Sequence, residues 1–76
     1  MKELIRMIAQ ALVDRPEQVE VAEIAGSNTL VIELKVAKED LGKIIGKQGR
    51  NAQAIRHILS SVSAREHRRV VLEIVE

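Results

Sequence analysis

Three glycines and three cations lie within ten residues, in the stretch LGKIIGKQGR from Leu41 to Arg50. The glycines are Gly42, Gly46 and Gly49. Each glycine inside a helix costs about 1 kcal/mol relative to alanine, so a small chain needs a reason to cluster them. The chemistry open to this stretch is anion binding, because glycine lets a ligand approach backbone N–H groups and the cations can contact phosphate oxygens.

The two common glycine-rich phosphate motifs do not fit the stretch. A Walker A loop ends in Gly-Lys-Ser/Thr, whereas Gly46-Lys47 is followed by Gln48. The dinucleotide pattern G-x-G-x-x-G fails as well, because three residues separate the first two glycines and no strand directly precedes them. Nucleotide hydrolysis and dinucleotide binding are therefore excluded, and a G-x-x-G loop, Gly46–Gly49, remains between two predicted helices.

Such a loop predicts a site for a ligand backbone that carries phosphates. Lys47 and Arg50 can contact its oxygens beside the N-terminus of the following helix, and Arg56 is predicted to add a peripheral phosphate contact. Gly42 would leave the first helix bare for a flat ligand group, or it would only allow close helix packing. Ile45 is an apolar floor for the ligand or a core residue, whereas its neighbour Ile44 is predicted to be core. The competing interpretation makes Gly46 an ordinary helix C-cap.

Other chemistry is not predicted. The chain has no cysteine, and the two histidines, His57 and His67, have no partners at metal-ligand spacing. Glu39 and Asp40 are adjacent on a helix, so the two carboxylates do not face a common point. We therefore predict neither a metal site, nor a cofactor, nor an enzyme.

The composition limits the remaining choices. The chain has 76 residues, 46% of them apolar, which predicts one domain over residues 1–76. No apolar run approaches the roughly 18 residues of a membrane span, and the charged N-terminus lacks the apolar segment of a signal peptide. We predict a cytoplasmic location without membrane attachment. The charge is uneven: residues 1–37 hold four cations and six acids, and residues 38–76 hold eight cations and five acids.

Hydrophobic periodicity predicts the elements that position the loop. We expect a helix over Lys2 to Val13 (with the stripe Leu4, Ile5, Ile8, Ala11 and Leu12), a hairpin that turns near Gly26–Asn28, a helix over Lys38–Ile45, a helix from Arg50 to about Ala64, and a strand over residues 68–76. In the hairpin's first strand Val19 and Val21 are out of phase with Ile24, which suggests a β-bulge. The order α-β-β-α-α-β predicts an α+β fold, with a three-stranded mixed sheet and three helices packed on one face.

The stretch GKIIGKQGRNAQAIRHIL within this order resembles a bacterial type II KH domain, and a free-standing chain of this length is similar to the KhpA group. The resemblance covers essentially the whole chain. It implies an RNA-binding protein and RNA chaperone that holds single-stranded RNA at its G-x-x-G loop. By residue, it implies that RNA contacts Gly46, Lys47, Gln48 and Gly49, flanked by Ile45 and Arg50. It also implies a larger KhpB (Jag-like) KH partner and a link to cell shape and envelope (cell wall) homeostasis.

Two further alternatives stay open. Nothing in the loop senses a 2′-OH, so single-stranded DNA is an alternative ligand, and a KH-fold module that mainly binds protein is an alternative function. The chain has no aromatic residue, so bases cannot stack on rings and the affinity should be modest. We also predict a homodimer with Ile58 near its axis, because the small neighbours Ala54 and Ser61 would let a partner helix approach. The competing interpretation makes Ile58 ordinary core.

Overall fold

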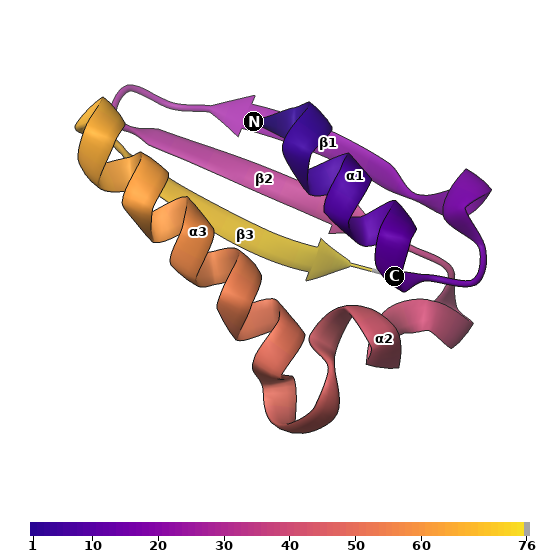
Figure 1. Ribbon diagram of the computed structural model, residues 1–76. Coiled ribbons are helices and arrows are strands. Elements are labelled where there is room, and N and C mark those ends of the chain that lie inside the picture. The colour runs from indigo at the N-terminus through magenta and orange to yellow at the C-terminus, as the bar shows by residue number, and fades with distance from the viewer. Residues whose placement is uncertain (76) are drawn as a thin grey trace.

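A computed structural model describes residues 1–75 and shows the predicted element order (Figure 1). The helices are α1 (Lys2–Leu12), α2 (Leu41–Ile45) and α3 (Arg50–Glu66), and the strands are β1 (Glu20–Ala25), β2 (Thr29–Lys35) and β3 (Arg69–Val75). Short 3-10 turns η1 (Pro16–Gln18), η2 (Lys38–Asp40) and η3 (Lys47–Gly49) lie between them. The predicted helix over Lys38–Ile45 is thus a 3-10 turn followed by a short α-helix. Glu76, predicted to end the last strand, lies outside the described residues.

The three strands form one mixed sheet in the order β1-β2-β3. β1 and β2 are antiparallel neighbours joined by a tight turn, and β2 and β3 are parallel neighbours. Parallel neighbours need a crossover connection, which α2 and α3 supply. In Figure 1, α1 and α3 lie on the same face of the sheet, and α2 joins that layer where α3 begins. The predicted type II KH fold is confirmed.

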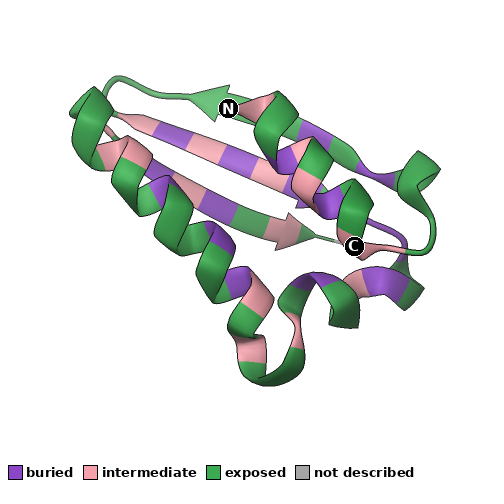
Figure 2. Cartoon of the chain, viewed as in Figure 1, coloured by how far each residue is buried: buried purple, intermediate pink, exposed green. Residues whose placement is uncertain are grey.

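The core lies between the sheet and these helices. Along β2 the side chains alternate, so that Leu30, Ile32 and Leu34 are buried. Figure 2 shows this alternation as purple and pink bands along the strand. α1 contributes Ile5 and Ala9, and α3 contributes Ala52, Ile55 and Leu59. Burying one such side chain contributes about 1.5–3 kcal/mol, so the alternation in β2 and the helical stripes hold the layers together. Within residues 1–75, no helix is long and apolar enough to cross a membrane.

Two predictions about the first part of the chain are wrong. β1 has no bulge, because its pairing with β2 runs without interruption from Glu20 opposite Lys35 to Ala25 opposite Leu30. Ile24 is instead on the opposite face of the sheet from Val21 and is 52% exposed. In α1, Leu4 and Ala11 are exposed although the periodicity placed them on the apolar stripe. The buried line of α1 passes through Ile5 and Ala9, four residues apart.

Candidate nucleic-acid interface

The two isoleucines that end α2 differ in burial. Ile44 is completely buried in the hydrophobic core, as predicted, whereas Ile45 is 43% exposed. α2 ends at Ile45, where the N–H of Gly46 donates to the carbonyl of Gly42 at 2.8 Å. A Cβ built on Gly42 would meet nothing within 4 Å. The interpretation of Gly42 as a device for close helix packing is therefore wrong, and this face of α2 is open.

Gly46 and Gly49 have different structural roles in the G-x-x-G loop. Gly46 has φ +78° and ψ 169°, a conformation essentially reserved for glycine. A Cβ on it would lie 2.6–2.8 Å from atoms of Asn51, so the residue must be glycine on steric grounds as well. Its ψ also differs from that of the left-handed cap expected for an ordinary helix end. Gly49 is left-handed with φ +75° and ψ 12°, and a Cβ there would meet open space.

Asn51 closes the loop from the other side, a role that the sequence did not reveal. Its Nδ2 donates to the carbonyl oxygen of Lys43 at 2.8 Å, which satisfies one of the free carbonyls at the end of α2. The bond joins the last turn of α2 to the first turn of α3. Both ends of the Gly46–Gly49 loop are thereby held. Asparagine is common in loops and at helix ends, so its type alone gave no signal.

The carboxylate of Asp40 connects the start of α2 to the segment that follows α1. The carboxylate is 1% exposed and accepts the backbone N–H groups of Asp14 at 3.3 Å and Arg15 at 3.1 Å. Lys43 Nζ lies 3.5 Å from Asp40 and 2.5 Å from Asp14. Burial is the largest single influence and favours the protonated acid, but these donors together outweigh it and lower the pKa of Asp40. The pKa of Lys43 is raised, mainly by its hydrogen bond to Asp14 and by the charge of that carboxylate.

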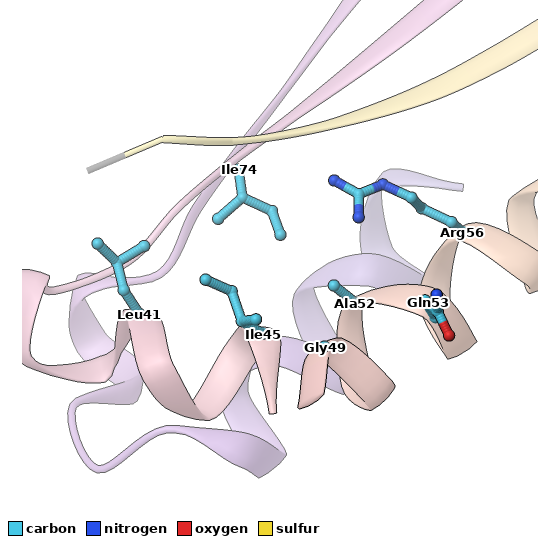
Figure 3. A pocket seen from close by; sticks show the side chains of 7 residues that line it. All are labelled: Leu41, Ile45, Gly49, Ala52, Gln53, Arg56 and Ile74. Carbon is cyan, nitrogen blue, oxygen red and sulfur yellow. The ribbon is translucent and has the colours of Figure 1, made fainter. Parts of the chain in front are cut away.

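A groove of about 580 Å³ opens beside the loop. It is called the apolar groove below and is lined by Leu41, Ile45, Gly49, Ala52, Gln53, Arg56 and Ile74. Figure 3 shows Leu41 and Ile45 pointing from α2 toward Ile74 of β3, while Arg56 extends from α3 on the opposite side. Three of the predicted ligand residues thus meet in one concave surface, namely Ile45, Gly49 and Arg56.

The other predicted ligand residues do not line the apolar groove. Gly42 lies in α2, Arg50 begins α3, and the loop between these helices contains Gly46, Lys47 and Gln48. Gln48 is left-handed like Gly49, with φ +58°, and its Oε1 accepts a 3.4 Å hydrogen bond from Arg50 Nη2. The sequence did not indicate Leu41, Ala52 or Ile74, because apolar periodicity assigned these positions to the core, and it gave no signal for the polar Gln53.

The cations near the groove differ in whether they are paired. Lys43 is held by two aspartates, whereas Lys47, Arg50 and Arg56 form none of the ion pairs found among residues 1–75. The first turn of α3 contains no acid, and no side chain caps its N-terminus. The free N–H groups and the positive end of the helix dipole are therefore available to an anion.

The residues predicted for self-association lie on α3 away from the groove. Ala54, Ile58 and Ser61 are all exposed, and Ile58 is 41% exposed, which excludes an ordinary core position. At 100° per residue they lie on the far flank of α3 from Gln53 and Arg56. His57 and His67 are exposed as well, and residues 1–75 contain no cluster of three side chains that could hold a metal ion.

Comparison with known proteins places this geometry in a family. A family profile described as KhpA/KhpB, KH domain matches residues 2–74. The chain is 56% identical to the RNA-binding protein KhpA of Caldanaerobacter subterraneus subsp. tengcongensis, covering 99% of this chain and 100% of that one. It is 54% identical to RNA-binding protein KhpA of Chlamydia muridarum, covering 100% and 97% of the two chains.

Solved structures show a similar fold within a larger protein. Residues of this chain superpose on Era of Aquifex aeolicus with a TM-score of 0.57, and on Era in complex with MgGDPNP and a segment of 16S ribosomal RNA with a TM-score of 0.58. Both are 29% identical and cover 96% of this chain, but the chain spans only 28% of each Era chain. The family match and the relatives that agree over their full length lead to the same assignment. The chain belongs to the KhpA/KhpB family of KH domains and, within it, to the KhpA group.

Proposed function

We propose that this protein binds single-stranded RNA across the Gly46–Gly49 loop and the apolar groove, without catalysis. The observation that carries the proposal is the groove itself. An exposed apolar floor and an unpaired arginine adjoin a glycine-dependent loop, in a chain whose relatives are named RNA-binding proteins. Phosphates would lie against the loop, and bases would lie on the floor.

The phosphate contacts follow from the charges around the loop. Lys47 and Arg50 are exposed and form no ion pair among residues 1–75, so they can meet phosphates without first giving up an ion pair; Arg50 would exchange only its long, exposed hydrogen bond to Gln48. The uncapped N-terminus of α3 adds backbone donors. Arg56 would contact a further phosphate or a base at the other end of the groove. Lys43 takes no part, because Asp14 and Asp40 already hold its ammonium group.

The base contacts would come from aliphatic side chains and backbone. Ile45 and Ile74 face each other across the groove (Figure 3). Gly42 leaves the neighbouring turn of α2 without a side chain. With no aromatic ring to stack on, each base gains less than the roughly 1–3 kcal/mol of an aromatic platform. We therefore expect micromolar or weaker affinity for a short segment, and an RNA chaperone needs only such transient contacts.

A double charge reversal in the loop tests the proposal. Lys47→Asp with Gln48→Asp places carboxylates against the phosphates, and RNA binding should fall about tenfold or more in about 0.1 M salt. Both positions are exposed, and aspartate tolerates the left-handed backbone of Gln48 better than most residues. Lys35→Asp with Gln10→Asp is the matched control, because it changes the same residue types at exposed sites outside the groove. Equal losses in both variants, by fluorescence anisotropy, would reject the loop as the site.

The ligand class can be decided in the same assay. The loop contains no group that visibly distinguishes ribose from deoxyribose, so a DNA oligonucleotide of the same base sequence is the direct competitor. Preference for RNA of threefold or more supports the proposal. Equal or tighter DNA binding would make the protein a binder of single-stranded DNA.

The exposed flank of α3 favours a second function, self-association. We propose a symmetric homodimer with Ile58 at its centre and Ala54 and Ser61 beside it, because a half-exposed isoleucine between small side chains suits close helix packing. Ile58→Tyr should yield a folded monomer by light scattering. A dimer that survives the change, or loss of the helical circular-dichroism signal, argues against this interface.

The same flank would also accept a related KH domain. By its membership of the family, we propose that the chain acts in the cytoplasm with a KhpB (Jag-like) partner, in post-transcriptional control of cell shape and cell wall homeostasis. Because the flank with Ile58 and the apolar groove lie on different sides of α3, partner and RNA could bind together. Co-purification of a KhpB-type protein with the unaltered chain, but not with Ile58→Tyr, is the test.

A further inference from the structure

The face of the sheet that points away from the helices carries its side chains in rows. Figure 1 shows α1 and α3 on one face of the sheet, and alternate residues of each strand lie on the other face, called the open face below. The strand register aligns these residues across the sheet. One row is apolar and consists of Ile24, Val31 and Val71. Ile24 is 52% exposed and the two valines are partly exposed, so this row is accessible to a partner.

The rows on either side of the apolar row carry opposite charges. Toward the end of β3, Glu33 is paired with Glu73, and toward its start Thr29 is paired with Arg69. Like charges directly opposite each other on one face repel. None of Glu33, Glu73 and Arg69 belongs to an ion pair among residues 1–75. The open face therefore holds two uncompensated carboxylates and an uncompensated cation, and the two groups are about 13 Å apart along β3.

This charge pattern is complementary to itself. Two open faces can pack about a two-fold axis that crosses the strands along the apolar row, so that each residue faces the one equally far beyond that row. Arg69 of each copy then faces Glu73 of the other, and Thr29 faces Glu33. Packed sheets lie about 10 Å apart, a distance that an arginine and a glutamate span together. An axis along the acidic row, or one parallel to β2, would instead place carboxylate against carboxylate.

We propose that the open face binds a second copy of this chain in this orientation, as a weak symmetric dimer. The apolar rows would cover each other, and two Arg69–Glu73 pairs would form per dimer. The face is only three strands wide, about 15 Å, so it offers less than the roughly 800 Å² per partner of a standard interface. We therefore expect a dissociation constant in the high micromolar range or above. This contact is separate from the one proposed at Ile58, which lies on α3 in the helix layer.

The orientation also has a consequence for RNA. The Gly46–Gly49 loop belongs to the helix layer and lies beside the apolar groove, which Ile74 near the end of β3 helps to line. Since the axis reverses the strand direction, the two loops would lie at opposite ends of the dimer and remain free. One dimer would then hold two RNA segments at once. This consequence rests on the proposed function, whereas the dimer itself does not.

The first test is a charge swap in the Ile58→Tyr chain, which lacks the other proposed contact. In sedimentation velocity up to about 1 mM protein, Glu73→Arg and Arg69→Glu should each weaken self-association about tenfold or more, because two ion pairs become like-charge contacts. The double variant restores both pairs with reversed sign and should return to within about threefold of its parent. Glu17→Arg, at an exposed acid of η1 outside the sheet, is the control and should have no effect.

The second test reads the register of the two sheets. The chain has no cysteine, so one introduced cysteine reports one position. Val31→Cys lies on the proposed axis, and a short bismaleimide should link it to its own copy. Lys35→Cys is the matched control, because it lies on the same face of β2 but about 13 Å from the axis, and it should remain unlinked.

Three results would overturn the proposal. They are a monomer at every concentration, a double swap that associates no better than the single variants, and equal linking at positions 31 and 35. The swap is repeated in the chain with Ile58 unaltered, so that a folding defect of Ile58→Tyr does not decide the outcome, and circular dichroism confirms that each variant is folded. RNA binding is tested separately by the loop charge reversal, so its failure and the failure of the dimer are distinguishable.

Discussion

The segment from Asp40 to Asn51 has an inner side, whose groups contact the rest of the protein, and an outer side, whose groups face solvent. The two sides differ in how many contacts their groups already make. On the inner side, Asp40 is saturated with donors, Ile44 is completely buried, and Asn51 holds the end of α2. On the outer side, Ile45 is exposed and Lys47 forms no ion pair among residues 1–75. The inner contacts fix the loop before any ligand arrives, so ordering it costs little on binding. Inner substitutions should therefore change stability, and outer ones should change affinity.

The largest expected effect is on the free energy of unfolding, and it distinguishes the neighbouring residues Ile44 and Ile45. Ile44→Ala should lower the free energy of unfolding by about 2–5 kcal/mol, because it empties a fully buried site. Ile45→Ala should cost less than about 1 kcal/mol but weaken RNA binding, because it removes part of the groove floor. Urea denaturation and fluorescence anisotropy measure the two quantities. The comparison fails if Ile45→Ala unfolds the protein as readily as Ile44→Ala does.

The next largest effect separates two glycines one helical turn apart. Gly46→Ala should cost at least about 1–3 kcal/mol from its backbone conformation, and the overlap with Asn51 adds to this. Gly42→Ala should instead stabilise the fold by about 0.4–1 kcal/mol, because a methyl group there meets open space inside a helix. If Gly42 leaves room for a base, the same variant should bind RNA more weakly. A more stable Gly42→Ala protein with unchanged RNA affinity would show that this face of α2 is not used.

These contrasts also show what the sequence could and could not predict. The element order and the loop followed from periodicity and turn residues, because those signals are local, and the parallel pairing followed from the order of the elements. Ile44 was predicted to be core, but for Ile45 the spacing left core and groove floor equally open, and only the packing of α2 in the folded chain decides between them. Asn51 was missed for the same reason, since its partner carbonyl on Lys43 comes into reach only once the loop has folded.

Polar groups were harder to predict than apolar ones. Asp40 was considered from the sequence only as the helix neighbour of Glu39, but its carboxylate accepts the N–H groups of Asp14 and Arg15 in the segment after α1, more than twenty residues away. Lys43 belongs to the same cluster of three cations as Lys47, and nothing in the sequence indicated that its ammonium group faces two aspartates. Spacing along the chain contains no information about such long-range partners.

The third prediction uses pH to measure how much the charge of the buried Asp40 carboxylate contributes to stability. The pKa of Asp40 is lowered in the folded chain, so its stabilising effect is complete above the ordinary aspartate pKa of about 3.9 and is lost as pH falls through the folded value. Asp40→Asn should therefore lower the melting temperature near neutral pH, and its deficit should shrink in acid below about pH 4. Glu17→Gln, at an exposed carboxylate of η1, is the control. A deficit of the same size at every pH would mean that the charge of Asp40 is unimportant.

The smallest expected effect concerns the two lysines on either side of Gly46. Lys47→Gln should reduce the slope of log affinity against log salt by about one, since each neutralised phosphate contributes about 0.7 for a single strand and the weakened loop contact loses part of another. Lys43→Gln should leave that slope unchanged, because Asp14 and Asp40 already neutralise this ammonium group. It should lower thermal stability instead, since it removes a donor from the buried Asp40 carboxylate. Titrations between about 0.05 and 0.3 M salt measure both slopes. Equal slopes for the two variants would mean that the cations of this segment act only through their summed charge. Lys43 on the inner side and Lys47 on the outer side would then contribute equally to the attraction of RNA.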